Sequence, residues 1–179
     1  MAIAASDIKV KLSIKTGSAG NSAAQADPNA SLGKYISTTE VGTSLHDLFD
    51  AISGTENAAS DVEYRCVFIH NAHGSLTAES VSVYIDSETA GGASIALAVD
   101  GTAASAIGSA SAQADEVADE STAPSGESFS SPTTDGGGIS VGDIAAGECR
   151  AIWIRRTAAD TAAIDADGFT LGVAWDTAA

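Results

Sequence analysis

The fold is decided by the stretch DVEYRCVFIHN, residues 61–71. Side chains of an extended chain alternate between two faces, and here both faces are apolar: Tyr64, Cys66 and Phe68 on one, Val67 and Ile69 on the other. A strand of this kind is covered on both sides, as in the middle of a sheet. We therefore expect residues 61–71 to form a central strand.

A second stretch, CRAIWIRR at residues 149–156, has the same character and is a second candidate for a central strand. Shorter alternating runs predict further strands at residues 8–14, 76–86, 94–100 and 169–175. In the first of these, lysines occupy the polar face. The turn-forming sequence at 71–74 predicts that the strands 61–71 and 76–86 pair as a hairpin.

One short helix is expected between residues 44 and 53. Its apolar residues recur at the helical spacing i, i+3, i+4 and i+7: Leu45, Leu48, Phe49 and Ile52. Ser44 is the natural N-cap, Asp47 follows three residues later, and Gly54 comes after the end. Several antiparallel strands with one short helix indicate a single all-β domain over residues 1–179, an antiparallel β-sandwich of the jelly-roll or immunoglobulin-like kind.

Two long segments rich in Gly, Ala and Ser interrupt the strands. Residues 16–33 have the composition of a flexible arm or loop, and no packed element is expected there. Residues 102–138 form a long acidic excursion with very few large apolar residues. A short strand around 127–130 is the candidate anchor for its middle. Loops of this length are usually functional or disordered.

The charge balance excludes one class of partner. The chain has 8 Lys and Arg against 24 Asp and Glu, a net charge of −16, so it would repel the phosphates of nucleic acid. The sequence also has no apolar run of about 18 residues and no secretory signal at its start, so we expect neither a membrane partner nor export through a signal peptide. No Lys or Arg lies between Arg65 and Arg150, whereas acidic residues are frequent there.

The two cysteines, Cys66 and Cys149, lie within the apolar strands. The preferred interpretation is that both are small buried apolar side chains, and a disulfide between neighbouring strands is the alternative. Arg65 and Arg150 adjoin them in sequence, but strand alternation directs those side chains to the opposite face. A reactive thiol is therefore not expected.

No motif predicts catalysis. The histidines, His46, His70 and His73, are not part of an HExxH pattern, and no serine lies in a GxSxG motif. The glycines at 136–138 are not followed by the Lys-Ser or Lys-Thr of a phosphate-binding loop. We expect a protein that is not an enzyme and has no cofactor.

Asp165 and Asp167, followed by Gly168, are a weak candidate for calcium. The two carboxylates stand two residues apart before a glycine, as in calcium-binding loops, but the further ligands of such loops are absent at the required spacing. A hairpin turn with solvated aspartates is the preferred interpretation.

Basic residues are the candidates for contacts with a partner: Lys9, Lys11, Lys15, Arg155 and Arg156. Adjacent guanidinium groups bind carboxylates well. The partner of Arg155 and Arg156 can be a carboxylate of the same chain, or a residue of another subunit or of another protein surface, and both alternatives stay open.

Four blocks of sequence together carry a resemblance. They are STTE…LFDAISGTE within residues 37–56, YRCVF at 64–68, TAPSGESFSSPT at 122–133, and GDIAAGE with IWIRRT within 142–157. In this order they resemble a group of virion structural proteins of tailed bacteriophages, over about two thirds of the chain. The interval 101–119 departs from that pattern in its richness in Ala, Ser and acidic residues.

This resemblance implies a virion component, assembled in the host cytoplasm, with no catalytic residues to carry over. A capsid decoration or cement protein agrees best with a small β domain that has loops and arms. Its partners would be the major capsid protein and other copies of itself, such as a trimer at a local threefold axis. A tail-associated or baseplate sandwich, or a receptor- or glycan-binding fibre module, is the alternative.

Overall fold

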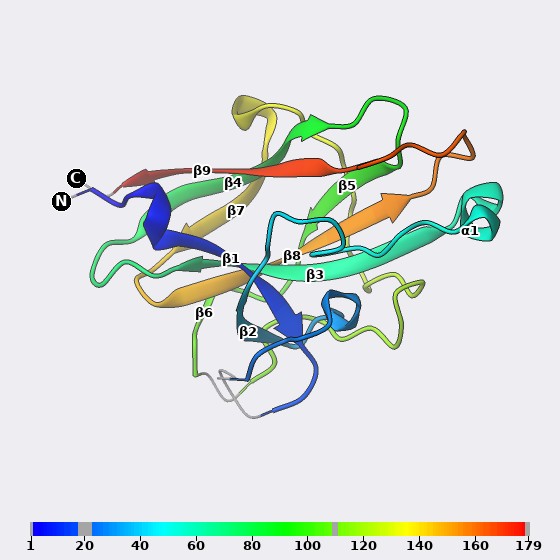
Figure 1. Ribbon diagram of the computed structural model, residues 1–179. Helices are drawn as coiled ribbons and strands as arrows, with labels where there is room; N and C mark the ends of the chain where they lie inside the picture. Colours follow the sequence, from blue (N-terminus) through cyan, green and yellow to red (C-terminus); the bar gives the residue numbers. More distant parts are fainter. Residues whose placement is uncertain (1, 18–22, 109–110, 178–179) are drawn as a thin grey trace.

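The structure is a computed structural model that describes residues 2–17, 23–108 and 111–177 (Figure 1). Within these ranges the chain forms nine strands, one α-helix and three short 3₁₀ segments. They are η1 (Ala5–Asp7), β1 (Ile8–Ile14), η2 (Pro28–Ala30), β2 (Tyr35–Glu40), α1 (Gly54–Ala59), β3 (Val62–Asn71), β4 (Ala78–Glu88), β5 (Ser94–Val99), β6 (Ser105–Ala106), η3 (Asp135–Gly137), β7 (Ile139–Ile144), β8 (Glu148–Thr157) and β9 (Phe169–Thr177). No helix in the described ranges is long and apolar enough to cross a membrane.

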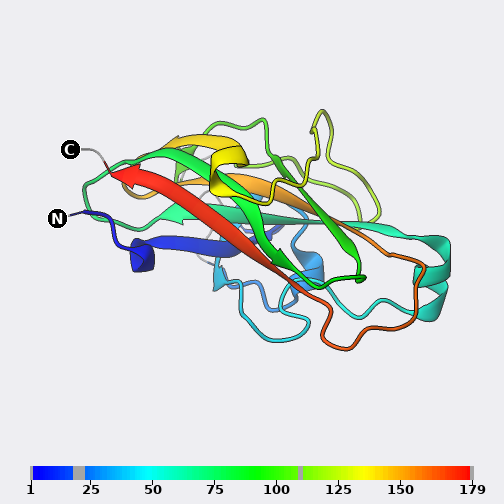
Figure 2. The ribbon, with the colours of Figure 1, turned by 90° about the horizontal axis from the view of Figure 1, so that it is seen from above.

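Two antiparallel sheets pack face to face. The large sheet has the order β2-β1-β3-β8-β5, with β6 also paired to β8, and the small sheet has the order β7-β4-β9. Every strand pair is antiparallel. Figures 1 and 2 show the small sheet lying across one face of the large sheet. The predicted all-β sandwich with one short helix and long loops is confirmed.

The two strands expected at the centre of a sheet are neighbours in the middle of the large sheet. β3 and β8 pair from Val62 opposite Thr157 to His70 opposite Cys149. Their side chains enter two separate apolar clusters. Val67 and Ile152 belong to the inner core between the two sheets, whereas Trp153, which is fully buried, belongs to an outer cluster on the other face of the large sheet. The prediction of strands covered on both sides is confirmed.

Irregular chain covers the outer cluster. We call residues 23–34 and 111–130 the loop layer. Leu32 from its first segment, and Ala114 and Val117 from its second, pack against the outer cluster. The expectation that residues 16–33 contain no packed element is therefore wrong for 23–33, which include η2 and the buried residue Gln25. Residues 18–22 of the predicted arm lie outside the described part of the chain.

The long segment 102–138 is ordered over its described residues, and 109–110 lie outside them. In place of a strand at 127–130, a single bridge joins Ser130 to Leu97. The two segments of the loop layer also bind each other. Gly33, with φ of 93°, brings its Cα so close to Asp115 that an added Cβ would lie 1.8 Å from the carbonyl oxygen. Only glycine fits this approach.

The expected helix at residues 44–53 is wrong. His46 has a φ of 69°, and a residue in this left-handed region interrupts a right-handed helix. Asp47 accepts a hydrogen bond from the Ser44 amide, so the predicted cap closes an isolated turn. The helix begins after these residues, at Gly54, where Ser53 and Glu56 form a reciprocal capping box.

The predicted hairpin is also wrong, because β3 belongs to the large sheet and β4 to the small one. Both edges of β3 are already paired, with β1 and β8. The connection is fixed by the buried Asn71, whose side-chain amide donates to the carbonyls of Leu76 and Ile144. His73 Nδ1 accepts hydrogen bonds from two amides of the same turn. These bonds direct the chain into the second sheet.

Candidate functional site

A cluster of charged side chains lies at the end of the large sheet near α1. We call Asp50, Glu63, Arg65, Glu120 and Arg156 the arginine–carboxylate cluster. Glu63 on β3 lies directly opposite Arg156 on β8. Arg156 Nε donates to Glu63 Oε2 over 2.7 Å, and Nη2 binds the same oxygen. Arg156 also binds the carbonyl and the carboxylate of Asp50, at 2.6 and 3.3 Å.

Arg65, two residues after Glu63, lies on the same face of β3 and is fully buried. Its Nη2 donates to Glu120 Oε2 at 2.6 Å and to Asn29 Oδ1 at 2.9 Å, and its Nε donates to the Leu48 carbonyl. The guanidinium carbons of Arg65 and Arg156 lie 5.1 and 4.6 Å from the centre of the Phe49 ring, an arrangement that favours cation–π attraction. The cluster thereby fastens three loops to one end of the sheet.

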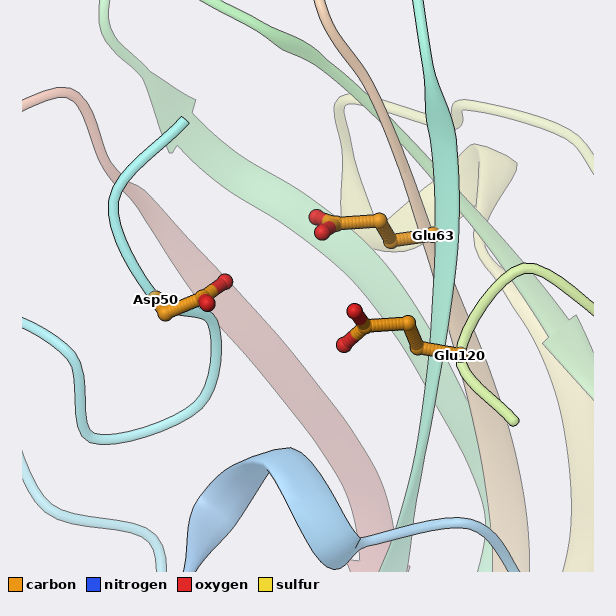
Figure 3. A group of neighbouring side chains, drawn as sticks. All are labelled: Asp50, Glu63 and Glu120. Carbon is orange, nitrogen blue, oxygen red and sulfur yellow. The ribbon is translucent and has the colours of Figure 1, made fainter. Parts of the chain in front are cut away.

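Three carboxylates converge here: oxygens of Asp50, Glu63 and Glu120 lie within 4.8 Å of one another (Figure 3). Each of these carboxylates is already bound by a guanidinium group. Burial raises the pKa of Glu63, and the charge of Arg156 opposes that rise. The guanidinium groups hold the place that a cation would take, so the arrangement is an ion-pair network that organises loops.

A second buried acid organises the loop layer. Asp100, at the end of β5, is 1% exposed. Its Oδ2 accepts from Trp153 Nε1 at 2.8 Å and from the Asp115 amide at 2.9 Å, while Oδ1 accepts from the Thr102 amide at 2.8 Å. A carboxylate is suited to this position because it accepts several hydrogen bonds and donates none.

Buried Gln113 has a similar role. Its Oε1 accepts from the Ile36 amide, and its Nε2 donates to Ser105 and Ala106. Through these bonds the loop layer is joined to β2 and β6. The acidic excursion is thus a covering layer with specific polar anchors.

Most of the basic residues predicted to contact a partner have partners within the chain. Arg156 belongs to the arginine–carboxylate cluster, so its internal-partner alternative is the one observed. Arg155 lies 5.2 Å from the centre of the Phe129 ring, and Lys15 Nζ donates to the Val117 carbonyl at 2.7 Å. Both contacts hold the loop layer.

The lysines of β1 lie on its polar face as expected. Lys9 forms an ion pair of 3.2 Å with Glu40 on β2. Lys11 is half-buried and forms no ion pair with any described residue. Contact with another protein stays a prediction for these lysines, for Lys15 and for the two arginines.

The two calcium candidates lie in the loop before β9. Asp167 Oδ2 accepts a hydrogen bond of 2.7 Å from the Ala93 amide, and Asp165 is exposed. Among the described residues, neither belongs to a group of three possible metal ligands. Calcium binding here stays a prediction, with the hydrogen bond to Ala93 giving Asp167 a structural role.

The cysteines follow the preferred interpretation. Both are free and buried. They are not opposite each other in the β3–β8 pair, because Cys66 lies opposite Trp153 and Cys149 lies opposite His70. Burial raises the pKa of the Cys66 thiol well above its usual value and that of Cys149 to about 12. Neither is a thiolate near neutral pH.

An open cavity of about 750 Å³ lies beside the arginine–carboxylate cluster, between the loops 41–53 and 159–168. Phe49 and Arg156 contribute to its lining, as do Leu45 and Ile164, two of the exposed large apolar residues.

The sequence did not single out Asp50, Glu63, Glu120 or Asp100, since nothing in the spacing of these acids predicts that loops bring them together.

None of the family models, curated proteins or solved structures compared with this chain matches it.

Proposed function

We propose that this chain is a non-enzymatic structural protein of a virion, a decoration or cement protein that binds the outside of a phage head and stabilises contacts between capsomers. The observation that carries the proposal is the use of its charged residues. In the described residues, the buried acids and arginines that could do chemistry are bonded to one another and to loop backbone. What the domain offers to other molecules is a rigid surface.

Two features support a binding role of this kind. The sequence blocks that resemble phage virion proteins include parts of β3 and β8, the central strands of the large sheet. The long loops, which are usual places for binding residues, are held in defined positions by buried polar anchors. Ordered loops lose little conformational entropy on binding, which favours a stable attachment.

The decisive experiment is a map of the virion in which copies of this protein are counted. Hundreds of copies over the shell would support a decoration protein. A few copies at the tail would support the tail or baseplate alternative, and absence from purified particles would contradict a virion role.

A variant tests which face binds the particle. Lys11→Glu reverses a charge that no internal ion pair requires, whereas Lys9→Glu also breaks the pair with Glu40. If β1 faces an acidic capsid surface, particles stripped of the protein should retain less of Lys11→Glu than of the wild type, and the neutral Lys11→Gln should lie between them. Equal retention of all three forms would contradict this orientation.

A glycan-binding role has one structural requirement, an exposed aromatic platform. Trp153 is fully buried and cannot supply it. Trp175 packs against the inner core and is partly buried, so part of its ring stays accessible. Protection of Trp175 fluorescence from a quencher by a sugar would favour the fibre alternative over a decoration protein.

A further inference from the structure

β9 is an edge strand without a neighbour on one side. Within the described residues it pairs only with β4, although it is nine residues long. Its sequence FTLGVAWDT lacks the Pro and Lys that protect many edges from pairing, and it has only one charged residue, Asp176. The ladder between β9 and β4 has two irregularities, and both lie where β4 has an extra residue. A long, nearly neutral edge with unpaired backbone groups is suited to accept another strand.

The inner side of β9 also leaves apolar surface incompletely covered. Leu171, Val173 and Trp175 pack against the inner core but are only partly buried, as are Ile8 and Val10 of β1. The small sheet has three strands and the path of the large sheet has five, so the small sheet is the narrower of the two. β9 is its edge strand, and no further strand of the small sheet lies beyond β9 among the described residues. In Figures 1 and 2, β4 and β7 lie on one side of β9, and no strand lies on its other side. The N-terminal segment reaches the end of β9, where the Ile3 amide donates to Thr177 Oγ1.

We propose that β9 of one copy pairs antiparallel with β9 of a second copy around a two-fold axis, so that the two small sheets become one continuous sheet. A pair centred on Val173 would place Asp176 opposite Thr170, Trp175 opposite Leu171, and Ala174 opposite Gly172. No like charges face each other in this register, and an aromatic side chain meets an aliphatic one. The edge is thus complementary to itself, which is what a two-fold interface requires.

The near neutrality of β9 favours a second copy over a basic partner at this edge. Of the 24 acidic residues, β9 contributes only Asp176, so the edge has little to attract a positively charged segment. Two copies with a net charge of −16 repel each other at long range, and salt screens that repulsion. The dimer should therefore strengthen as ionic strength rises.

The dimer should be weak. β9 and its neighbours on β1 form a patch smaller than the roughly 20 to 30 residues that each side of a standard interface contributes. We expect a dissociation constant in the micromolar range. A dimer of this kind can form whether or not the chain binds a virion.

Sedimentation velocity over a series of protein concentrations tests the pairing, with three variants of exposed residues on the outer side of β9. Thr170→Asp places a carboxylate opposite Asp176 of the other copy, twice in each dimer, and should weaken the dimer about fivefold. Thr170→Asn is the neutral control of similar shape and should behave as the wild type. The double variant Thr170→Asp with Asp176→Lys makes both pairs attractive and should restore the dimer.

The outcomes separate the possibilities. A wild type that stays monomeric at millimolar concentration and high salt would overturn the proposal. So would a dimer or trimer that Thr170→Asp leaves unchanged, or one that the double variant fails to restore, because another surface or register would then be in use. Circular dichroism and thermal unfolding of each variant confirm that the sandwich is folded, so that weakened association is not a loss of structure.

Discussion

Replacement of Asp100 should most clearly weaken the attachment of the loop layer to the large sheet. In Asp100→Asn one carboxylate oxygen becomes an amide nitrogen. The less harmful orientation keeps the acceptor for Trp153 and Asp115, but it directs an NH₂ group at the Thr102 amide. A hydrogen bond to a charged acceptor contributes about 1.5 to 3 kcal/mol, and the two remaining bonds lose the charge of their acceptor. We expect the free energy of unfolding to fall by about 3 kcal/mol.

The matched control is Asp119→Asn. Asp119 also accepts three hydrogen bonds, from Ser121 and Thr122, but it lies on the surface. This substitution should lower the free energy of unfolding much less than Asp100→Asn does, because water replaces the lost bonds. Urea unfolding followed by tryptophan fluorescence measures both variants, and a red-shifted native spectrum would show that Trp153 has become wet. Equal costs for the two variants would refute the claim that Asp100 is an organising residue of the buried layer.

Two further predictions concern other buried groups. Burial, followed by the charges of Lys11 and Lys9, lowers the pKa of His70 to about 4, although Glu40 acts in the opposite direction. Because histidine in the unfolded chain binds its proton near pH 6.5, the folded state loses stability as pH falls from about 6.5 to 4. Relative to His70→Gln, which does not titrate, the wild type should lose about 2 kcal/mol of unfolding free energy between about pH 7 and pH 4.5, measured by urea unfolding. A difference between the two proteins that stays constant with pH would contradict this. Arg156→Met leaves acids of the arginine–carboxylate cluster without their counter-charge and should lower the free energy of unfolding by about 3 to 5 kcal/mol. Adding Glu63→Leu should recover much of this loss in a double-mutant cycle, and additive losses would exclude the coupling.

The strands were predictable because a strand buried on a face must alternate, whatever its partner. β3 and β8 show apolar residues on both faces, and the structure buries both. β1 shows one polar face, and its lysines lie there. The burial of Cys66 follows from the same alternation, because its side chain lies on the same apolar face of β3 as Phe68.

Choices between nearly equivalent local structures were not predictable in this way. The apolar spacing at residues 45–52 suits a helix, but Leu48 and Phe49 are buried by docking at the end of the large sheet, and His46 breaks the helical path. The capping pattern of Ser53 and Glu56 was present in the sequence and marks the helix that does form. Short patterns of this kind are decided by tertiary contacts.

The arginine–carboxylate cluster lay beyond sequence reasoning for a related reason. The pair Glu63 and Arg156 requires the register of β3 against β8, and Asp50 and Glu120 come from loops without periodicity. Adjacent arginines at the end of an apolar strand did indicate a need for carboxylates. Which carboxylates meet that need depends on the path of the loops.

The loop layer has a consequence for the order in which the molecule folds. Its segments hold each other through the close approach of Gly33 to Asp115, yet neither has regular structure that could form alone. They can settle only on a large sheet whose β3 and β8 are already aligned, and those strands are themselves far apart in sequence. We therefore expect the burial of Trp153 to be a late event of refolding. Until it occurs, the chain exposes the apolar outer cluster to other molecules in solution.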